Sequence, residues 1–128
     1  MKDLVSISDK LTEKSKVYPD KKYCQKLDGQ YITFGNLEKN VNRCCRLLSE
    51  KGLVHGNILT ICIPNSISFI IFFLAGIRSG IKVNPCPSSL SESELLRNIS
   101  FVKSDLLVSS TSIINKSIAS KKGHFLFK

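Results

Sequence analysis

The chain has 128 residues, about the length of one ordinary domain. Apolar residues make up 42% and charged residues 23%, which excludes a disordered tail, a collagen-like fibre and a heptad-biased coiled coil. Its five cysteines form no CxxC pair, which argues against a zinc ribbon or a secreted disulfide scaffold.

The charge balance is basic: 19 Lys and Arg against 10 Asp and Glu give +9. Such an excess can signal nucleic acid or an anionic membrane surface. Both halves of the chain share it, however, and the tightest basic stretch, Lys116 to Lys128, lacks the interleaved aromatic side chains of a stacking platform. We therefore expect a solvated lysine-rich surface and no nucleic-acid partner.

The N-terminus begins Met1-Lys2-Asp3 and continues as an amphipathic stretch, without the apolar core of a secretory signal. We expect a cytoplasmic protein whose cysteines are free thiols. Most of them should behave as small buried hydrophobic residues.

The first elements are a helix and a hairpin. Residues 4–16 predict a helix, followed by Pro19-Asp20, with one apolar face of Leu4, Ile7 and Leu11. Two short runs, Tyr23–Leu27 and Gln30–Phe34, flank Asp28-Gly29. An Asp-Gly pair between alternating runs predicts a β-hairpin with a type I′ turn, which needs positive φ at both central residues.

A second helix is predicted from Phe34 to about Lys51, with Thr33 as its N-cap and Gly52 as the left-handed residue past its end. Its inward stripe should consist of Leu37, Val41, Cys45 and Leu48.

From Ile58 to Ile77 the chain carries no charge, which is long enough for a membrane helix. Pro64-Asn65-Ser66 interrupts this window, and proline in a helix interior costs about 3 kcal/mol or more. We therefore expect a buried strand, Ile58–Ile63, and a helix from Ile67 to about Arg78, capped by Ser66 and closed by Gly80. A helix apolar nearly all round is expected to lie between layers.

The same alternation continues. A short strand is predicted at Ile81–Val83, followed by Pro85-Cys86-Pro87. Ser91 and Glu94 form a capping box that opens a helix through about Val102. The run Asp105–Ser109 predicts another buried strand. Strand–helix–strand–helix–strand predicts an α/β fold with parallel strands and right-handed crossovers. Beyond it we expect a short helix near residues 113–119 and a strand at residues 124–127.

The search for a site is largely negative. The sequence has no GxGxxG, Walker A, HExxH or GxSxG motif. His55, beside Gly56-Asn57, is expected in a turn, and His124 lies far from it in the chain. Ser109 to Ser112 with Lys116 could hold a phosphate, but no glycine falls between Ser109 and Lys116. No catalytic, cofactor-binding or metal-binding residue is assigned.

In order and spacing, the middle segments resemble the start of the adenylate-forming (AMP-binding) enzymes, a superfamily that includes acyl-CoA synthetases, 4-coumarate–CoA ligases and luciferases. The resemblance rests on Thr33 to Leu37, Gly56-Asn57, Pro64-Asn65-Ser66, Val83-Asn84-Pro85 and Ser93 to Leu96. It is strongest over residues 4–110. Asn57 departs from the aspartate usual in the family, and Pro87-Ser88 from the frequent asparagine-proline.

The resemblance implies the N-terminal portion of a large domain that is incomplete here. The full-length family joins a carboxylate to AMP with ATP and magnesium, then passes the acyl group to a thiol such as coenzyme A, as in fatty acid metabolism. The family's phosphate loop and catalytic lysine are not present in this sequence. The chain alone is therefore expected to be an inactive scaffold fragment of an acid–thiol ligase.

Three alternatives follow for the chain itself. The first is a fragment whose partner is the C-terminal remainder of the enzyme. The second is a stand-alone interaction module or pseudoenzyme. The third is a small membrane-associated protein that uses Ile58–Ile77. Apolar surface left uncovered by missing layers is expected to favour self-association.

Overall fold

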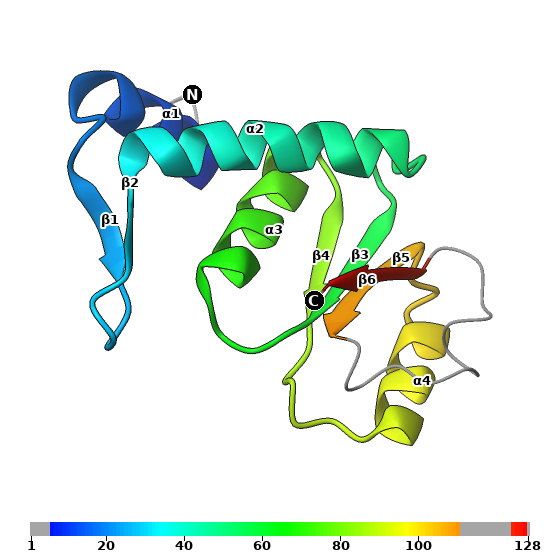
Figure 1. Ribbon diagram of the computed structural model, residues 1–128. Coiled ribbons are helices and arrows are strands. Elements are labelled where there is room, and N and C mark those ends of the chain that lie inside the picture. The colour runs from blue at the N-terminus through cyan, green and yellow to red at the C-terminus, as the bar shows by residue number, and fades with distance from the viewer. Residues whose placement is uncertain (1–5, 111–123, 128) are drawn as a thin grey trace.

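A computed structural model describes residues 6–110 and 124–127 of the chain. In chain order the elements are α1 (Ile7–Val17), β1 (Lys22–Gln25), β2 (Tyr31–Thr33), α2 (Phe34–Glu50), β3 (Ile58–Cys62), α3 (Ile67–Arg78), β4 (Lys82–Pro85), α4 (Glu92–Phe101), β5 (Leu106–Ser110) and β6 (His124–Phe127) (Figure 1). The predicted α/β class is confirmed, as is the strand at residues 124–127. The helix expected near 113–119 lies outside the described residues.

The main sheet has the order β4-β3-β5-β6, and each pair of neighbours is parallel. In the register, Leu59 of β3 pairs with Val83 on one side and with Leu106 on the other. From β3 the chain crosses over to β4 on one side and then returns past β3 to β5 on the other. Because both crossovers are expected to be right-handed, their helices α3 and α4 must cover opposite faces of the sheet.

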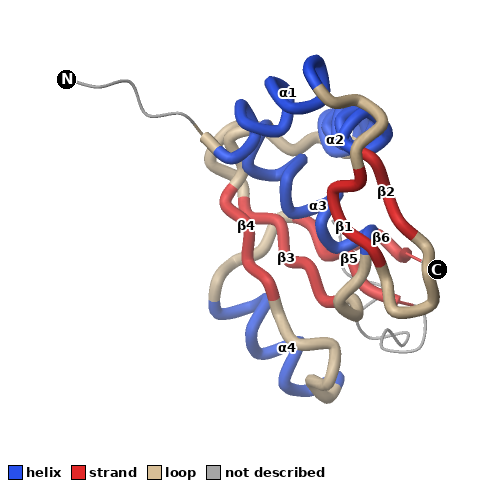
Figure 2. Tube along the Cα trace, turned by 90° about the vertical axis from the view of Figure 1, so that its left-hand side faces the viewer, coloured by secondary structure: helices blue, strands red, loops and turns tan. Residues whose placement is uncertain are grey.

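The side chains of the sheet divide accordingly between two cores. On one face Leu59, Ile61 and Val108 join α1, α2, α3 and the hairpin in the larger core. On the other face Leu107 and Cys62 meet Leu95 and Ile99 of α4 in a smaller one, and Figure 2 shows α4 apart from the other helices. A strand covered on both faces is buried along its length, and β3 is fully buried from Leu59 to Cys62, as predicted.

Helix α2 lies across the larger core and buries Leu37, Val41, Cys44 and Leu48. The predicted stripe was incomplete: Cys45 packs half-buried against the core as expected, but Cys44, which was not predicted to face inward, is buried as well. The reason is that α2 contacts two helices, α1 and α3. Cys45 faces the second, and its thiol lies 3.6 Å from the Ala75 carbonyl oxygen.

The long uncharged window divides at Pro64 as predicted, into β3 and the twelve-residue α3. No described helix has both the length and the apolar character to span a membrane. Phe72, Leu74, Ala75 and Gly76 of α3 are buried and its other residues are half-buried. The second half of α3 is therefore buried as predicted for a helix between layers, whereas its first half is only partly covered.

The hairpin forms where predicted, but its turn differs. Lys26 N–H donates to the Gln30 carbonyl (2.6 Å) and Gly29 N–H to the Lys26 carbonyl (3.0 Å), which leaves a three-residue loop. Gly29 has a φ of +91°, whereas Asp28 is not among the residues with positive φ. The Asp28 carboxylate instead accepts the Gln30 N–H at 2.9 Å. The type I′ prediction was wrong because this local bond favours a three-residue turn closed by a left-handed glycine.

The helix caps agree with the sequence at Thr33, Ser66 and Ser91, each of which accepts a backbone N–H at 3.2 Å. Helix α1 begins later than predicted because Ser6 and Asp9 form a capping box. Of the face predicted for α1, Leu11 is buried but Ile7 is 54% exposed. Leu4 lies outside the described residues.

Arg78, at the C-terminal end of α3, joins the three helices of the larger core. It pairs with Glu38 of α2 at 2.7 Å, and both side chains are only 18% exposed. Its guanidinium also donates to the Ser8 and Thr12 hydroxyls of α1 at 2.6 and 2.9 Å. A largely buried guanidinium with this many acceptors holds the helices in one relative orientation.

We predict that Arg78→Met lowers the free energy of unfolding by about 2 kcal/mol or more, because Glu38 keeps a poorly hydrated charge without its partner. Urea denaturation of the chain measures the loss. Arg97→Met is the matched control, because Arg97 is exposed on α4. It should change the free energy of unfolding by less than about 0.5 kcal/mol. Equal effects of the two substitutions would show that the Arg78 contacts add nothing to the fold.

Two glycines with positive φ permit a second test. Gly80 (φ +71°) and Gly52 (φ +88°) both close helices, as predicted, but a Cβ at Gly80 would overlap the His55 ring while a Cβ at Gly52 meets nothing within 4 Å. Gly52→Ala should lower the free energy of unfolding by about 1 kcal/mol, because alanine is strained in the left-handed backbone conformation. Gly80→Ala should cost about twice that or more.

The excess loss in Gly80→Ala should disappear when His55→Ala is combined with it, because the overlap involves only that ring. Thermal or urea unfolding of the single and double variants provides the measurement. If the excess persists in the double variant, the His55 contact is not its cause.

Candidate functional site

The carboxyl ends of parallel strands are where α/β folds bind ligands. Here β3 continues into Pro64-Asn65-Ser66, β4 into Cys86-Pro87, and β5 ends at Ser109-Ser110. These segments lie at one edge of the sheet because β3, β4 and β5 are parallel and in register.

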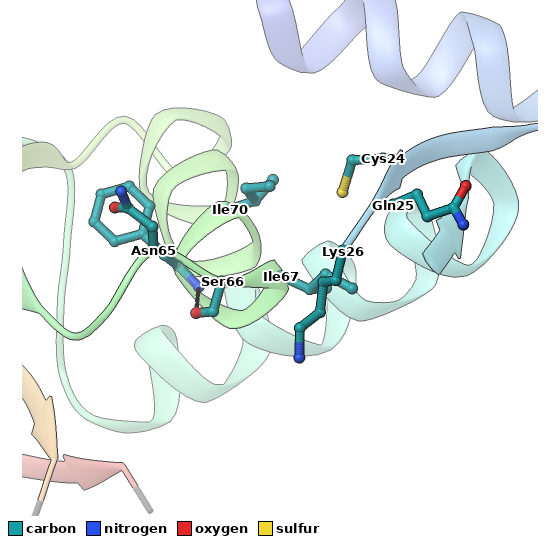
Figure 3. A pocket seen from close by; sticks show the side chains of 8 residues that line it. Cys24, Gln25, Lys26, Asn65, Ser66, Ile67 and Ile70 are labelled. Carbon is teal, nitrogen blue, oxygen red and sulfur yellow. Dashed lines mark hydrogen bonds between the residues drawn. The ribbon is translucent and has the colours of Figure 1, made fainter. Parts of the chain in front are cut away.

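A hollow of about 400 Å³ opens beside this edge, between the hairpin and the first turn of α3. Figure 3 shows Cys24 of β1 facing the side of α3 that carries Ile70. The hollow is lined by Cys24, Gln25, Lys26, Asn65, Ser66, Ile67, Phe69 and Ile70. Its volume lies within the range of small-molecule sites. Its wall on α3 is apolar, and Asn65 and Ser66 lie just before that helix.

Most polar groups around the hollow already have partners. Ser66 Oγ donates to the Pro64 carbonyl at 2.9 Å and accepts the Phe69 N–H. Lys26 Nζ lies 3.2 Å from Gln30 Oε1 and 3.6 Å from an Asp28 carboxylate oxygen. Asn65 is exposed and its side-chain amide has no hydrogen-bond partner among the described residues. The hollow therefore offers an apolar surface with the side-chain amides of Gln25 and Asn65 at its border, which suits contact with a ligand or chain segment.

The three buried thiols, those of Cys44, Cys62 and Cys86, do not provide a nucleophile. All five cysteines are free, as predicted. Burial, with a smaller contribution from Cys45, raises the pKa of Cys44 to about 12, and burial with Cys86 raises that of Cys62 to about 11. Burial also raises the pKa of Cys86. Such thiols stay protonated and unreactive at neutral pH.

Ser109 is the first residue of the phosphate loop considered from the sequence. It is fully buried near the end of β5, in register with Cys62, and its hydroxyl has no hydrogen-bond partner among the described residues. Thr111, Ser112 and Lys116 lie outside the described residues. The structure thus places one hydroxyl at the sheet edge and brings no lysine to it within residues 6–110 and 124–127.

The histidines likewise form no site with the described residues. His55 lies in a turn, as predicted, with its ring against the Gly80 backbone. His124 begins β6. Across the described ranges no three His, Cys, Asp or Glu side chains come together to hold a metal ion.

Sequence reasoning selected no site residue, and it missed the hollow. The hollow exists because Cys24 and Ile70, far apart in the chain, are brought together when the hairpin and α3 join one core. The alternation of side chains between the two faces of β1 could indicate that Cys24 faces inward. Nothing in the neighbouring sequence indicates which helix it contacts.

Comparison with known proteins accounts for the architecture. The sequence profile of the family described as AMP-binding enzyme matches residues 11–124. A probable CoA ligase, CCL9, from Humulus lupulus is 31% identical over 78 residues, which cover 61% of this chain and 15% of that protein. Oxalate–CoA ligase from Arabidopsis thaliana is 28% identical over 110 residues, covering 84% and 21%.

Among solved structures, the N-terminal domain of FACL13 from Mycobacterium tuberculosis superposes with a TM-score of 0.81 at 20% identity, over 92% of this chain and 31% of that one. This likeness shows that the fold is shared. The chain spans less than a quarter of the length of either curated relative, and the part it matches is N-terminal in FACL13. With a profile match over most of its length, the chain belongs to the AMP-binding enzyme family.

Proposed function

We propose that residues 1–128 are an N-terminal segment of an AMP-binding domain and act as scaffold in an ATP-dependent carboxylate–CoA ligase. The observation that carries the proposal is the family match over residues 11–124, together with two relatives that are CoA ligases or probable CoA ligases. The chain's own contribution is the parallel sheet and its two helical layers.

We expect the described residues to hold neither the triphosphate nor the magnesium ion of ATP. No metal-holding group of side chains occurs in residues 6–110 and 124–127, and the buried Ser109 hydroxyl is followed by no glycine before Lys116. A phosphate cradle requires several backbone N–H groups that converge on the anion, which glycine permits. We therefore derive no step of ligation from these side chains, and coenzyme A, like ATP, would bind to other parts of the ligase.

A second candidate is a stand-alone interaction module or pseudoenzyme. The hollow between the hairpin and α3 favours it, because its apolar wall can receive a partner segment without chemistry. Phe101, 88% exposed at the end of α4, is a further contact point and would support self-association. Free thiols at all five cysteines fit a reducing, cytoplasmic compartment.

We predict that the purified chain shows no saturable, magnesium-dependent binding of ATP in equilibrium dialysis, because residues 6–110 and 124–127 bring together no metal-holding side chains and the sequence has no Walker A motif. A full-length relative, such as the Arabidopsis oxalate–CoA ligase, serves as the positive control. Saturable binding by residues 1–128 that disappears on chelation of magnesium would overturn the scaffold proposal.

The transcript beyond codon 128 distinguishes the two candidates. A scaffold segment predicts further coding sequence, in frame or frame-shifted, that includes a glycine-rich loop ending in lysine. An interaction module predicts a stop codon with no such loop downstream.

A further inference from the structure

One end of the molecule carries most of its exposed apolar side chains. Eight large apolar side chains are exposed among the described residues, and five of them lie within residues 17–31: Val17, Tyr18, Tyr23, Leu27 and Tyr31. Residues 14–31, the C-terminal end of α1 and the β1–β2 hairpin, are called here the hairpin patch. Apolar groups clustered in this way mark a contact surface more often than isolated ones do.

Leu27 is the most exposed of these side chains. It sits in the three-residue loop at the hairpin turn and is 110% exposed. In Figure 1 the turn extends away from the helices and forms the edge of the molecule. A leucine that touches nothing at the tip of a projecting loop contributes nothing to the fold, so the core does not explain it.

The hairpin patch is also basic. Residues 14–31 contain five lysines (14, 16, 21, 22 and 26) and two aspartates (20 and 28), for a net charge of +3. Asp28 is paired with Lys26 at 3.6 Å. The remaining lysines have no acidic partner within 4 Å among the described residues. The patch therefore combines an apolar tip with a cationic surround.

The tyrosines indicate which anionic surface the patch suits. Lys14 and Lys21 lie over the Tyr18 ring at 5.5 and 5.4 Å, and Lys22 lies over the Tyr31 ring at 4.5 Å. Tyr23 is edge-on to Phe34 at 5.6 Å. Rings already covered by lysines or by another ring are poorly placed to stack on nucleic-acid bases. Tyrosine with lysine is, in contrast, the composition that anchors proteins at a membrane–water interface.

We infer that the hairpin patch binds the surface of a bilayer that contains anionic phospholipids, with Leu27 among the acyl chains and the lysines at the headgroups. No helix need cross the membrane. Each lysine near an anionic surface strengthens binding by about fivefold, and burial of one leucine contributes a similar or larger factor. Two such signals together give reversible attachment. A second copy of the chain is a poor occupant, because two patches of +3 repel each other.

The test is sedimentation of the 128-residue chain with vesicles of phosphatidylcholine, with and without phosphatidylserine as about one third of the lipid. We expect binding only to the anionic vesicles, with loss at high salt. Leu27→Asp should weaken it about tenfold or more. Lys21→Glu with Lys22→Glu should do the same.

Two matched controls lie away from the patch. Val54→Asp removes another exposed apolar side chain, and Lys82→Glu with Lys103→Glu reverses two exposed lysines near the amino ends of the strands. Each should change binding by less than about threefold. Circular dichroism should show unchanged melting for all variants, since none of these side chains is buried.

A second readout is specific to the patch. The chain has three tyrosines and no tryptophan, and all three tyrosines lie in residues 14–31, so tyrosine emission reports on this surface alone. Anionic vesicles should protect the emission from quenching by acrylamide.

Any of four results would overturn the inference. These are absent binding to anionic vesicles, equal binding to neutral ones, equal loss in patch and control variants, or tighter binding to single-stranded oligonucleotide with the same dependence on Lys21 and Lys22. The last would assign the patch to nucleic acid instead.

Discussion

The fold depends on covering both faces of β3, the second strand of the four-stranded sheet. Leu59 and Ile61 point to one face and Thr60 and Cys62 to the other, and all four are fully buried. A five-residue strand cannot supply its own cover, so β4 and β5 must lie on opposite sides of β3, with their right-handed crossovers placing α3 and α4 on opposite faces. The positions of the other elements follow from this requirement.

The layers that cover the two faces of the sheet are built differently. The larger core is closed by helices that the Arg78 guanidinium holds together through Glu38, Ser8 and Thr12. Under α4 the layer is thin and partly polar: Thr60 Oγ donates to Ser104 Oγ at 2.7 Å and accepts from the Asn84 amide, which also donates to Asn98. Buried polar groups cost little when each is paired. Both sides thus combine apolar packing with hydrogen bonds, but under α4 the hydrogen bonds reach the sheet itself, whereas on the α2 side they join the helices to one another.

Local signals in the sequence were enough for the elements of the α/β part. These signals are the proline at position 64, a serine or threonine before each helix, and a glycine after two of the helices. Each acts within a few residues, so it predicts a boundary without information about tertiary contacts. The errors arose where one face depends on two neighbours, as at Cys44 and Cys45, or where a side chain competes with a turn type, as at Asp28. Arg78 was not singled out, because its partners Ser8 and Glu38 lie 70 and 40 residues away in the chain. The hollow was missed for the same reason.

The sheet edge carries few uncommitted polar groups among the described residues. Its polar atoms are largely committed to holding the chain: Ser66 caps α3, the Cys62 thiol lies 3.4 Å from the Pro87 carbonyl, and the Cys86 thiol lies 3.3 Å from Asn98 Oδ1. Of the groups considered there, the Ser109 hydroxyl and the Asn65 amide lack a partner within the described residues. Neither acts by itself as a general acid or base, because a hydroxyl and an amide need a neighbouring acid or base to exchange protons with a substrate. A reaction at this edge therefore needs an acid, a base or a cation supplied by other groups.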